Sequence, residues 1–147
     1  MMWRKQYNIP YLFLDIDGVL NHNGSEWICK ENLANLIDII EKTNPRIILT
    51  SSWRLEVETA RMQYFFSLFE SYDTVIYDAT KDLGSRRKEI EQYVKRNRVK
   101  RYAILDDEDY YTGTKLIEHV FMTNFDEGLT KEIAERVTDY LSKEPVE

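Results

Sequence analysis

Short apolar runs alternate with longer amphipathic segments along this chain. Each short run ends in polar or turn-forming residues, which is typical of buried parallel strands. The strands predicted in this way are Leu12–Asp15, Arg46–Thr50, Thr74–Tyr77, Tyr102–Leu105 and Val120–Thr123. The longer segments carry apolar residues at helical spacing. The helices predicted in this way are Lys30–Lys42, 56–71, Ser85–Arg96 and Thr130–Ser142.

Strands that alternate with helices predict an α/β fold in which helices cover both faces of a parallel sheet. We expect a Rossmann-like three-layer α/β/α arrangement with a central parallel five-stranded sheet. The 147 residues, of which 43% are hydrophobic and 31% charged, suffice for one domain with its own core. The predicted domain therefore covers residues 1–147.

Composition also excludes several protein classes. No apolar run approaches the ~20 residues that a membrane-spanning helix needs, and the N-terminus lacks the apolar segment of a signal peptide. A single cysteine, Cys29, excludes an internal disulfide framework and a cysteine-based zinc site. We therefore expect a cytoplasmic protein without a membrane partner. The oligomeric state cannot be predicted from these features.

Charge is unevenly distributed along the chain. The net charge of −6 disfavours a general nucleic-acid binder. Residues 86–101, however, hold eight Lys or Arg and two Glu, a local charge of +6 that leaves −12 on the rest. This basic segment is either a phosphate-facing patch or a solvated helix face, and the sequence leaves both interpretations open.

Three of the predicted strands end in carboxylates or hydroxyls. These polar clusters are Asp15 with Asp17, Thr50 with Ser51, and Asp106 with Asp107. Ligands of parallel α/β sheets bind outside the carboxyl ends of the strands, so we expect the clusters to converge there. Asp15 and Asp17 project the same way, because side chains alternate along a strand. Two such carboxylates persist most easily beside a cation or with one proton.

The chemistry of these side chains favours a magnesium site that handles phosphate. Oxygen-only ligands in an open site suit Mg²⁺, and no cluster of His or Cys indicates zinc or a redox metal. The hydroxyls of Thr50 and Ser51 could donate hydrogen bonds to a phosphoryl oxygen. A positive side chain is then still needed to neutralise charge on the transferring group.

The basic helix can supply that cation. Ile90, Tyr93 and Val94 define its core-facing side. At 3.6 residues per turn, Arg86 lies within roughly 35° of that side and Arg87 about 65° from it. A cation in the first helical turn is disfavoured by the helix dipole, so it needs an anionic partner. We therefore expect Arg86, with Arg87 as second choice, to face the acidic pocket.

These motifs resemble those of the haloacid dehalogenase (HAD) superfamily of phosphohydrolases. Residues 12–21, Leu-Phe-Leu-Asp-Ile-Asp-Gly-Val-Leu-Asn, resemble its motif I, and Ile-Ile-Leu-Thr at 47–50 resembles its hydroxyl motif II. Arg86 stands where the motif III cation is expected, and Ile-Leu-Asp-Asp at 104–107 resembles the acidic motif IV. Three further segments are similar to the small HAD domains of RNA-repair proteins. They are Thr-Ser-Ser-Trp-Arg at 50–54, the residues 86–90, and Gly-Leu-Thr at 128–130.

The resemblance implies a phosphatase that forms an aspartyl-phosphate on Asp15, with Asp17 as general acid and base. It implies Mg²⁺ held by Asp15, the Asp17 main-chain carbonyl and Asp107, with Asp106 assisting or substituting. Thr50, or alternatively Ser51, would hold a phosphoryl oxygen. Arg86 would balance charge, although the family's usual residue at that place is Lys.

The resemblance also bears on the substrate. About a dozen residues separate Asp17 from the next helix, and fewer than ten separate Tyr77 from Ser85, so neither gap holds a cap domain. An open site favours a phosphate on a macromolecule, such as a 3′- or 5′-phosphorylated nucleic-acid end, or a nucleotide or phosphoprotein. Arg54 could hold a second phosphate or form a structural salt bridge, whereas His22 and His119 are interpreted as bystanders.

Four aromatic residues look exposed and would suit a stacked nucleic-acid strand, although packing in the core or rim is the alternative: Trp27, Trp53, Tyr110 and Tyr111. Two other functions stay open. One is a small-metabolite phosphatase whose lid comes from a second subunit, and the other is a non-catalytic phosphate-binding HAD-like module. The leaving group, the choice between RNA and DNA, and a kinase or ligase partner cannot be predicted.

Overall fold

The computed structural model describes residues 8–25 and 27–143. It contains a five-stranded, all-parallel sheet in the order β3-β2-β1-β4-β5, which confirms the predicted α/β class. The strands are β1 (Pro10–Leu14), β2 (Arg46–Leu49), β3 (Asp78–Ala79), β4 (Arg101–Asp106) and β5 (Val120–Met122). The α-helices are α2 (Lys30–Thr43), α3 (Ala60–Ser71), α4 (Arg86–Arg96) and α5 (Lys131–Ser142). Two 3₁₀ helices are also present, η1 (Ser52–Leu55) and η2 (Lys115–His119).

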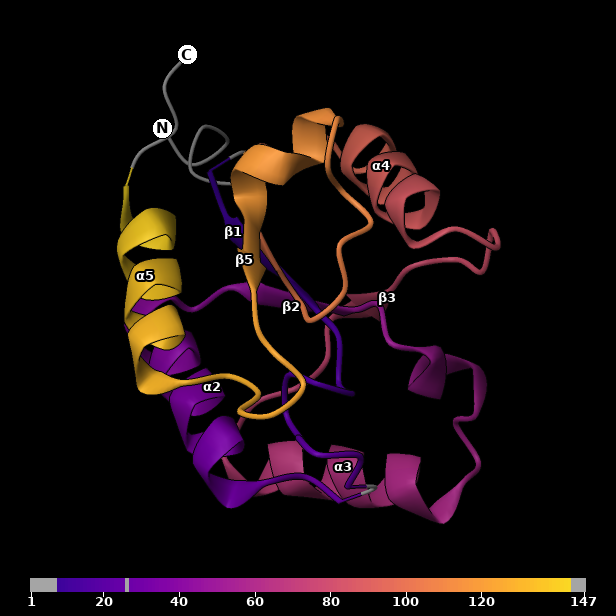
Figure 1. Ribbon diagram of the computed structural model, residues 1–147, viewed down its shortest axis with the longest axis vertical. Coiled ribbons are helices and arrows are strands. Elements are labelled where there is room, and N and C mark those ends of the chain that lie inside the picture. Colours follow the sequence, from indigo (N-terminus) through magenta and orange to yellow (C-terminus); the bar gives the residue numbers. More distant parts are fainter. Residues whose placement is uncertain (1–7, 26, 144–147) are drawn as a thin grey trace.

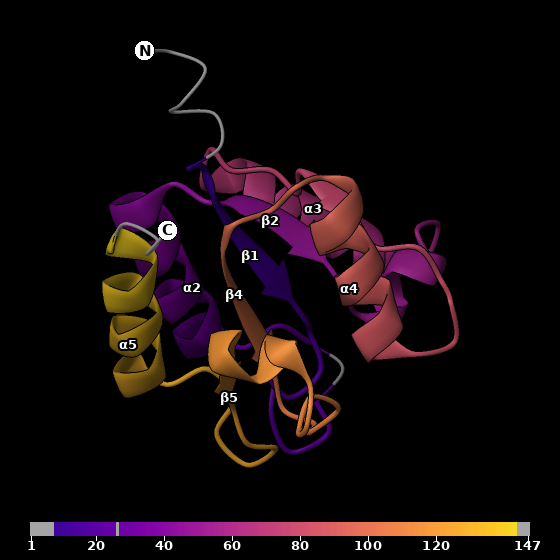
Figure 2. The same cartoon turned by 90° about the horizontal axis from the view of Figure 1, so that it is seen from above.

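Helices cover both faces of the sheet (Figures 1 and 2). On one face α2, α3 and α5 enclose the larger apolar core, to which β1 contributes Leu12 and Leu14. On the other face α4 and η2 enclose a second core, to which β1 contributes Phe13. The strands are buried on both faces, so they are apolar throughout rather than alternating.

Two predicted elements differ from the structure. The third strand is not Thr74–Tyr77 but Asp78–Ala79, because at this edge of the sheet only these two residues come into register with β2. Helix α3 begins at Ala60 rather than at residue 56. The hydroxyl of Thr59 accepts a hydrogen bond from the backbone N–H of Met62 and so fixes the start of the helix.

Among the described residues, no domain is inserted after β1 or after β3, so no cap domain covers the carboxyl edge of the sheet. This agrees with the prediction that the fold lacks a cap. Within the same residues, no helix combines the length and the apolar character needed to cross a membrane.

The strand register sets up the site. Leu14 of β1 lies opposite Leu49 of β2 and Leu105 of β4. Backbone hydrogen bonds continue the pairing one residue further, from Asp15 N to Leu105 O at 3.1 Å and from Thr50 N to Leu14 O at 2.9 Å. The next residue of each strand therefore stands in one row at the carboxyl edge.

Candidate active site

The row consists of Thr50, Asp15 and Asp106, which come from three adjacent strands. Each stands two positions after a residue of the core beneath α4, namely Ile48, Phe13 and Ile104. Because side chains alternate along a strand, all three are directed to the α4 side of the sheet. The sequence prediction that polar groups from separate strands meet at one edge is therefore met by these three residues.

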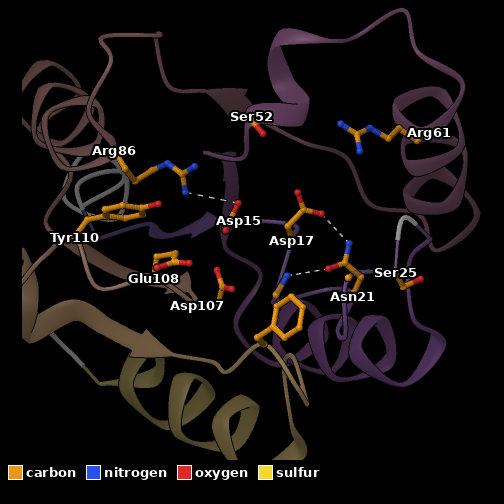
Figure 3. A pocket seen from close by; sticks show the side chains of 13 residues that line it. Asp15, Asp17, Asn21, Ser25, Ser52, Arg61, Arg86, Asp107, Glu108 and Tyr110 are labelled. Atoms are coloured by element: carbon orange, nitrogen blue, oxygen red, sulfur yellow. Dashed lines mark hydrogen bonds and ion pairs between the residues drawn. The ribbon is translucent and has the colours of Figure 1, made fainter.

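Arg86 joins the two acids of the row. Its Nη1 lies 3.0 Å from Asp106 Oδ2 and 3.6 Å from Asp15 Oδ1 (Figure 3). Arg86 is the first residue of α4, whose N-cap Ser85 accepts a hydrogen bond from Lys88 N. Although burial lowers the pKa of the guanidinium, the charges of Asp15 and Asp106 outweigh it and raise that pKa. The predicted inward orientation of Arg86 is confirmed.

The two neighbouring acids of β4 have different surroundings. Asp106 is fully buried and accepts hydrogen bonds from Arg86, from the Tyr111 hydroxyl at 2.8 Å and from the Glu108 backbone at 3.0 Å. Asp107 instead lines the pocket. It packs so closely on Gly18 that a Cβ at that position would overlap its carboxylate, and Gly18 also has a positive φ of 79°. The carboxylate of Asp106 is thus engaged in hydrogen bonds within the protein, whereas that of Asp107 is accessible to a ligand in the pocket.

Burial and the charges of neighbouring acids raise the pKa values of two of these acids, Asp15 and Asp107. Burial, together with the neighbouring charge of Asp106, raises the pKa of Asp15 well above its ordinary value, although Arg86 opposes the shift. Burial and the charges of Asp106 and Glu108 raise the pKa of Asp107 to about 6. The positive charge of Arg86 therefore does not fully offset the negative charge of the acids at this edge of the sheet.

Asp17 is held by two donors. The amide of Asn21 donates to its Oδ1 at 2.9 Å, and the indole Nε1 of Trp53 donates to its Oδ2 at 3.1 Å. The Asn21 carbonyl in turn accepts from Gly18 N at 2.8 Å. This clamp leaves the exposed Asp17 carboxylate in a fixed orientation inside the pocket. The sequence analysis missed Asn21, although it stands at the end of the motif I segment.

The two candidate hydroxyls of β2 also differ. Ser51 Oγ caps η1 by accepting from Trp53 N at 3.2 Å. Thr50 Oγ1 is buried and has no hydrogen-bond partner among the described residues, and the same holds for Thr80 Oγ1. A buried hydroxyl that is left unpaired costs free energy, so Thr50 is the better candidate for a ligand contact.

The pocket at this edge is open and has a volume of about 480 Å³. Acidic side chains from two segments line it together with two arginines and two aromatic rings. The lining residues are Asp15, Asp17, Gly18, Asn21, Gly24, Ser25, Ser52, Arg61, Arg86, Asp107, Glu108, Tyr110 and Phe125 (Figure 3).

The comparison with protein families shows to which family the chain belongs. A model described as the HAD domain in Swiss Army Knife RNA repair proteins matches residues 11–134, from β1 into α5. The chain belongs to this family. No curated protein and no solved structure gave a match. The matched range contains Asp15, Thr50, Arg86 and the pair Asp106–Asp107.

The donor set of this HAD domain fits a divalent ion. Carboxylate oxygens of Asp15, Asp106 and Asp107 lie within 4.8 Å of one another. Burial and the charges of neighbouring acids raise the pKa values of Asp15 and Asp107, so a bound cation would stabilise their ionised forms. Hard oxygen ligands and a surplus of negative charge match the preferences of Mg²⁺.

Arg54 does not line the pocket. Its guanidinium is buried, lies 3.1 Å from Glu89 Oε1, and donates to the carbonyls of Thr50, Ser51 and Thr80. The interpretation of Arg54 as a second phosphate ligand is therefore wrong, and the alternative of a structural ion pair is what the structure contains. The sequence analysis did not identify its partner, the buried Glu89.

The basic segment is also not at the pocket, apart from Arg86. Arg87 is half-exposed, pairs with Glu91 at 3.4 Å and does not line the pocket. Helix α4 runs back toward the amino ends of the strands, and β4 begins at Arg101. The basic end of α4 and the residues that connect it to β4 therefore lie at the opposite edge of the sheet. For most of the segment, the solvated-face interpretation therefore replaces that of a phosphate patch.

Two of the four aromatic candidates are buried. Trp53 is 1% exposed beside Asp17, and Tyr111 is 0% exposed beside Asp106, so neither can stack on a substrate. Both supply hydrogen bonds to acids instead, and burial raises the pKa of Tyr111 so that its hydroxyl keeps its proton. Trp27 and Tyr110 are exposed, as expected.

The two histidines lie outside the pocket lining. His22 Nδ1 is 3.0 Å from Asn32 Oδ1, and Asn32 in turn holds the carbonyls of Glu127 and Leu129. His119 stacks on Tyr102 with ring centroids 3.8 Å apart. Both contacts are structural, in line with the sequence interpretation.

The raised pKa of Asp107 predicts how the metal-free protein responds to pH. Between the ordinary value of 3.8 and about 6, the unfolded chain loses this proton while the folded protein keeps it. The contribution of Asp107 to the free energy of unfolding therefore falls as pH rises through that window. Urea unfolding in EDTA should show that wild type loses more stability than Asp107→Asn between pH 4 and 6. Parallel curves would contradict the shift.

The buried ion pair of Arg54 predicts a large stability effect. Arg54→Ala leaves Glu89 without its closest cationic partner, and breaking a buried pair costs about 3–5 kcal/mol of unfolding free energy. Arg87→Ala, which breaks an exposed pair, is the matched control and should cost less than about 1 kcal/mol. Equal losses in urea unfolding would contradict the structural role of Arg54.

Proposed function

We propose that this HAD domain is a Mg²⁺-dependent phosphomonoesterase that acts through an aspartyl-phosphate on nucleic-acid ends or nucleotides. The observation that carries the proposal is the row at the carboxyl edge. Asp15 stands there between the unpaired hydroxyl of Thr50 and the arginine-bound Asp106, and faces a pocket that also holds Asp17.

Asp15 is the proposed nucleophile. Its carboxylate oxygen attacks the phosphorus atom, and the bond from phosphorus to the leaving oxygen breaks while Asp17 donates a proton to that oxygen. Asp17 then takes a proton from water, whose oxygen attacks the phosphorus and releases inorganic phosphate from Asp15. Covalent catalysis of this kind splits one difficult displacement into two easier ones.

Other residues of the row stabilise charge. Arg86 lies beside the Asp15 oxygen and can offset negative charge on nucleophile and phosphoryl group. Thr50 Oγ1 would find in a phosphoryl oxygen the acceptor that it lacks. Asp106 keeps Arg86 in place through its 3.0 Å bond and is the proposed positioning residue.

Asp15 and Asp107 would hold Mg²⁺, with the Asp17 main-chain carbonyl as the third protein ligand. The fit rests on the carboxylate oxygens that lie within 4.8 Å of one another. When bound, the ion would supply Lewis-acid stabilisation of the phosphoryl oxygens. Asp106 already accepts three hydrogen bonds, so the assisting role suits it better than that of a main ligand.

The substrate class is inferred from the open site and from the family. No cap domain among the described residues covers the pocket that Asp15 lines, so a phosphate at the end of a long strand could reach Asp15 without a lid. The matched family takes its description from RNA repair proteins, which supports a 3′- or 5′-phosphorylated nucleic-acid end. We also propose a cytoplasmic location, since the single cysteine Cys29 is free.

The nucleophile and the metal can be tested together. With p-nitrophenyl phosphate, Asp15→Asn should lower kcat by at least about 1,000-fold, because the covalent route is lost. EDTA should abolish wild-type activity and Mg²⁺ should restore it. Asp38→Asn, on the outer surface of α2, is the control and should keep wild-type activity. Full activity of Asp15→Asn, or activity in EDTA, would refute the mechanism.

The clamp on Asp17 predicts a leaving-group effect. Trp53→Phe keeps an aromatic ring, although a smaller one, and removes the N–H that fixes the acid. Since a poor leaving group needs the proton most, kcat for an alkyl phosphate should fall about tenfold more than kcat for p-nitrophenyl phosphate. Equal losses for both substrates would indicate only a packing role for Trp53.

A further inference from the structure

The pocket holds a second cation that the proposed chemistry does not use. Among the described residues that line the pocket, the arginines are Arg86 and Arg61. Arg86 serves the acids of the row, whereas Arg61 projects from α3 on the other side of Asp17 (Figure 3). The two cations therefore flank the acidic centre from different helices.

Arg61 is positioned by a stack of side chains that ends at the proposed general acid. Its Cζ atom lies 4.4 Å from the centroid of the Trp53 ring, and Trp53 Nε1 lies 3.1 Å from Asp17 Oδ2. One indole ring thus separates Arg61 from the acid that protonates the leaving group. A group bound to Arg61 would lie on the leaving-group side of the scissile bond.

The guanidinium of Arg61 has free hydrogen-bonding capacity. Nη2 pairs with Glu56 Oε2 at 2.6 Å, and no other hydrogen bond of its guanidinium is found among the described residues. The side chains of Arg61 and Glu56 are 33% and 49% exposed. Exposed pairs of this kind stabilise little and exchange readily. Stacking on Trp53 fixes the plane of the guanidinium and leaves its edge available to an anion.

Two exposed aromatic rings continue the surface beyond Arg61. Tyr64 follows Arg61 by three residues and so lies on the same face of α3. Its ring makes an edge-to-face contact with Trp27 at 5.7 Å, and the two side chains are 44% and 61% exposed. We call Arg61, Tyr64 and Trp27 the α3 rim. A cation followed by open aromatic faces is the arrangement that binds a single-stranded nucleic acid.

The other cations named by the sequence cannot take this role. Arg54 is buried against Glu89 and backbone carbonyls, and Arg87 does not line the pocket. The basic end of α4 lies at the opposite edge of the sheet. The α3 rim is therefore a basic and aromatic surface that adjoins Asp17 on the side away from Arg86.

We propose that the α3 rim binds the second nucleotide of a single-stranded substrate. Arg61 binds the phosphodiester next to the terminal phosphate, and Trp27, supported by Tyr64, stacks on the following base. The inference rests on the proposed phosphatase function and specifies its substrate as an oligonucleotide rather than a mononucleotide. A phosphopeptide offers neither a second phosphate nor a base, so the rim favours nucleic acid.

Chain length is the first test. Oligouridylates of one, two and three nucleotides, with the phosphate at the 3′ end in one set and at the 5′ end in the other, are the substrates. For the better-cleaved end, kcat/KM should rise about tenfold between one nucleotide and two or three, as expected for a charge-assisted contact. No gain with length, or a better kcat/KM for a phosphopeptide, would overturn the proposal.

Variants of the rim then assign the gain to its residues. Arg61→Ala should remove most of the length-dependent gain and reduce the salt slope of log kcat/KM by about 0.7, the share of one phosphate contact in a single strand. Arg61→Lys should keep the salt slope. Trp27→Ala should lower kcat/KM for the trinucleotide about tenfold, as for a lost base stack.

Arg136→Ala is the matched control. Arg136 also stacks on an aromatic ring from a helix, with its Cζ 5.6 Å from the Phe121 centroid, but it lies on α5 and does not line the pocket. It should leave both the length-dependent gain and the salt slope unchanged. Equal changes in Arg61→Ala and Arg136→Ala would overturn the proposal.

Binding separates this inference from the catalytic proposal. In the Asp15→Asn background, the Kd for a trinucleotide should be about tenfold lower than for a mononucleotide, and adding Arg61→Ala should abolish that difference. Tryptophan fluorescence provides the readout. If wild type hydrolyses no phosphate ester, the proposed function fails while this binding comparison still tests the rim. Equal Kd values for the two ligands would overturn the rim alone.

Discussion

The contacts of Arg86 with Asp15 and Asp106 are the interaction on which the site depends. The parallel register of β1 and β4 brings these two acids side by side at the edge of the sheet, where burial removes most of their hydration. Two buried carboxylates repel each other, so the arrangement needs a cation inside the row. Because Arg86 opens α4, its ion pairs also fix the start of that helix over the carboxyl edge. The helix dipole disfavours a cation there, and Asp15, Asp106 and the nearby Glu89 offset that cost.

One arginine leaves the edge negatively charged, and that imbalance links the fold to the proposed chemistry. The pKa of Asp15 is raised by burial and by Asp106, and the pKa of Asp107 is raised to about 6. A divalent ion would offset this charge and would in turn attract a phosphate dianion. The unpaired hydroxyl of Thr50 stands next to Asp15 in the row, where a phosphoryl oxygen would satisfy it. The acids, the arginine and the hydroxyl therefore form a site with excess negative charge and an unpaired donor. A divalent ion would neutralise the first, and a phosphoryl oxygen would accept a hydrogen bond from the second.

The fold and the centre of the site could be predicted because both follow from the regular spacing of apolar residues along strands and helices. Apolar runs located the strands, and the helical angle from Ile90 and Tyr93 placed Arg86 inward. Trp53 lies in a 3₁₀ turn and Tyr111 in a loop, where no period indicates the direction of the side chain. Each side chain is buried and donates a hydrogen bond to an acid, Trp53 to Asp17 and Tyr111 to Asp106. The sequence could not decide between the two interpretations of Arg54 because its partner Glu89 lies 35 positions away in the chain. Arg61 was missed because its position beside the pocket depends on its stacking on Trp53, a tertiary contact.

The central claim is that groups from three strand ends form one site for a divalent ion and a phosphoryl group. Anomalous scattering from a crystal soaked with Mn²⁺, which takes similar oxygen ligands, together with a phosphate mimic tests this claim most directly. The account predicts one ion in contact with carboxylate oxygens of both Asp15 and Asp107, and the mimic between Asp15 and Thr50 within hydrogen-bond distance of Arg86. An ion bound elsewhere, or carboxylates of Asp15 and Asp107 that do not share it, would contradict the account.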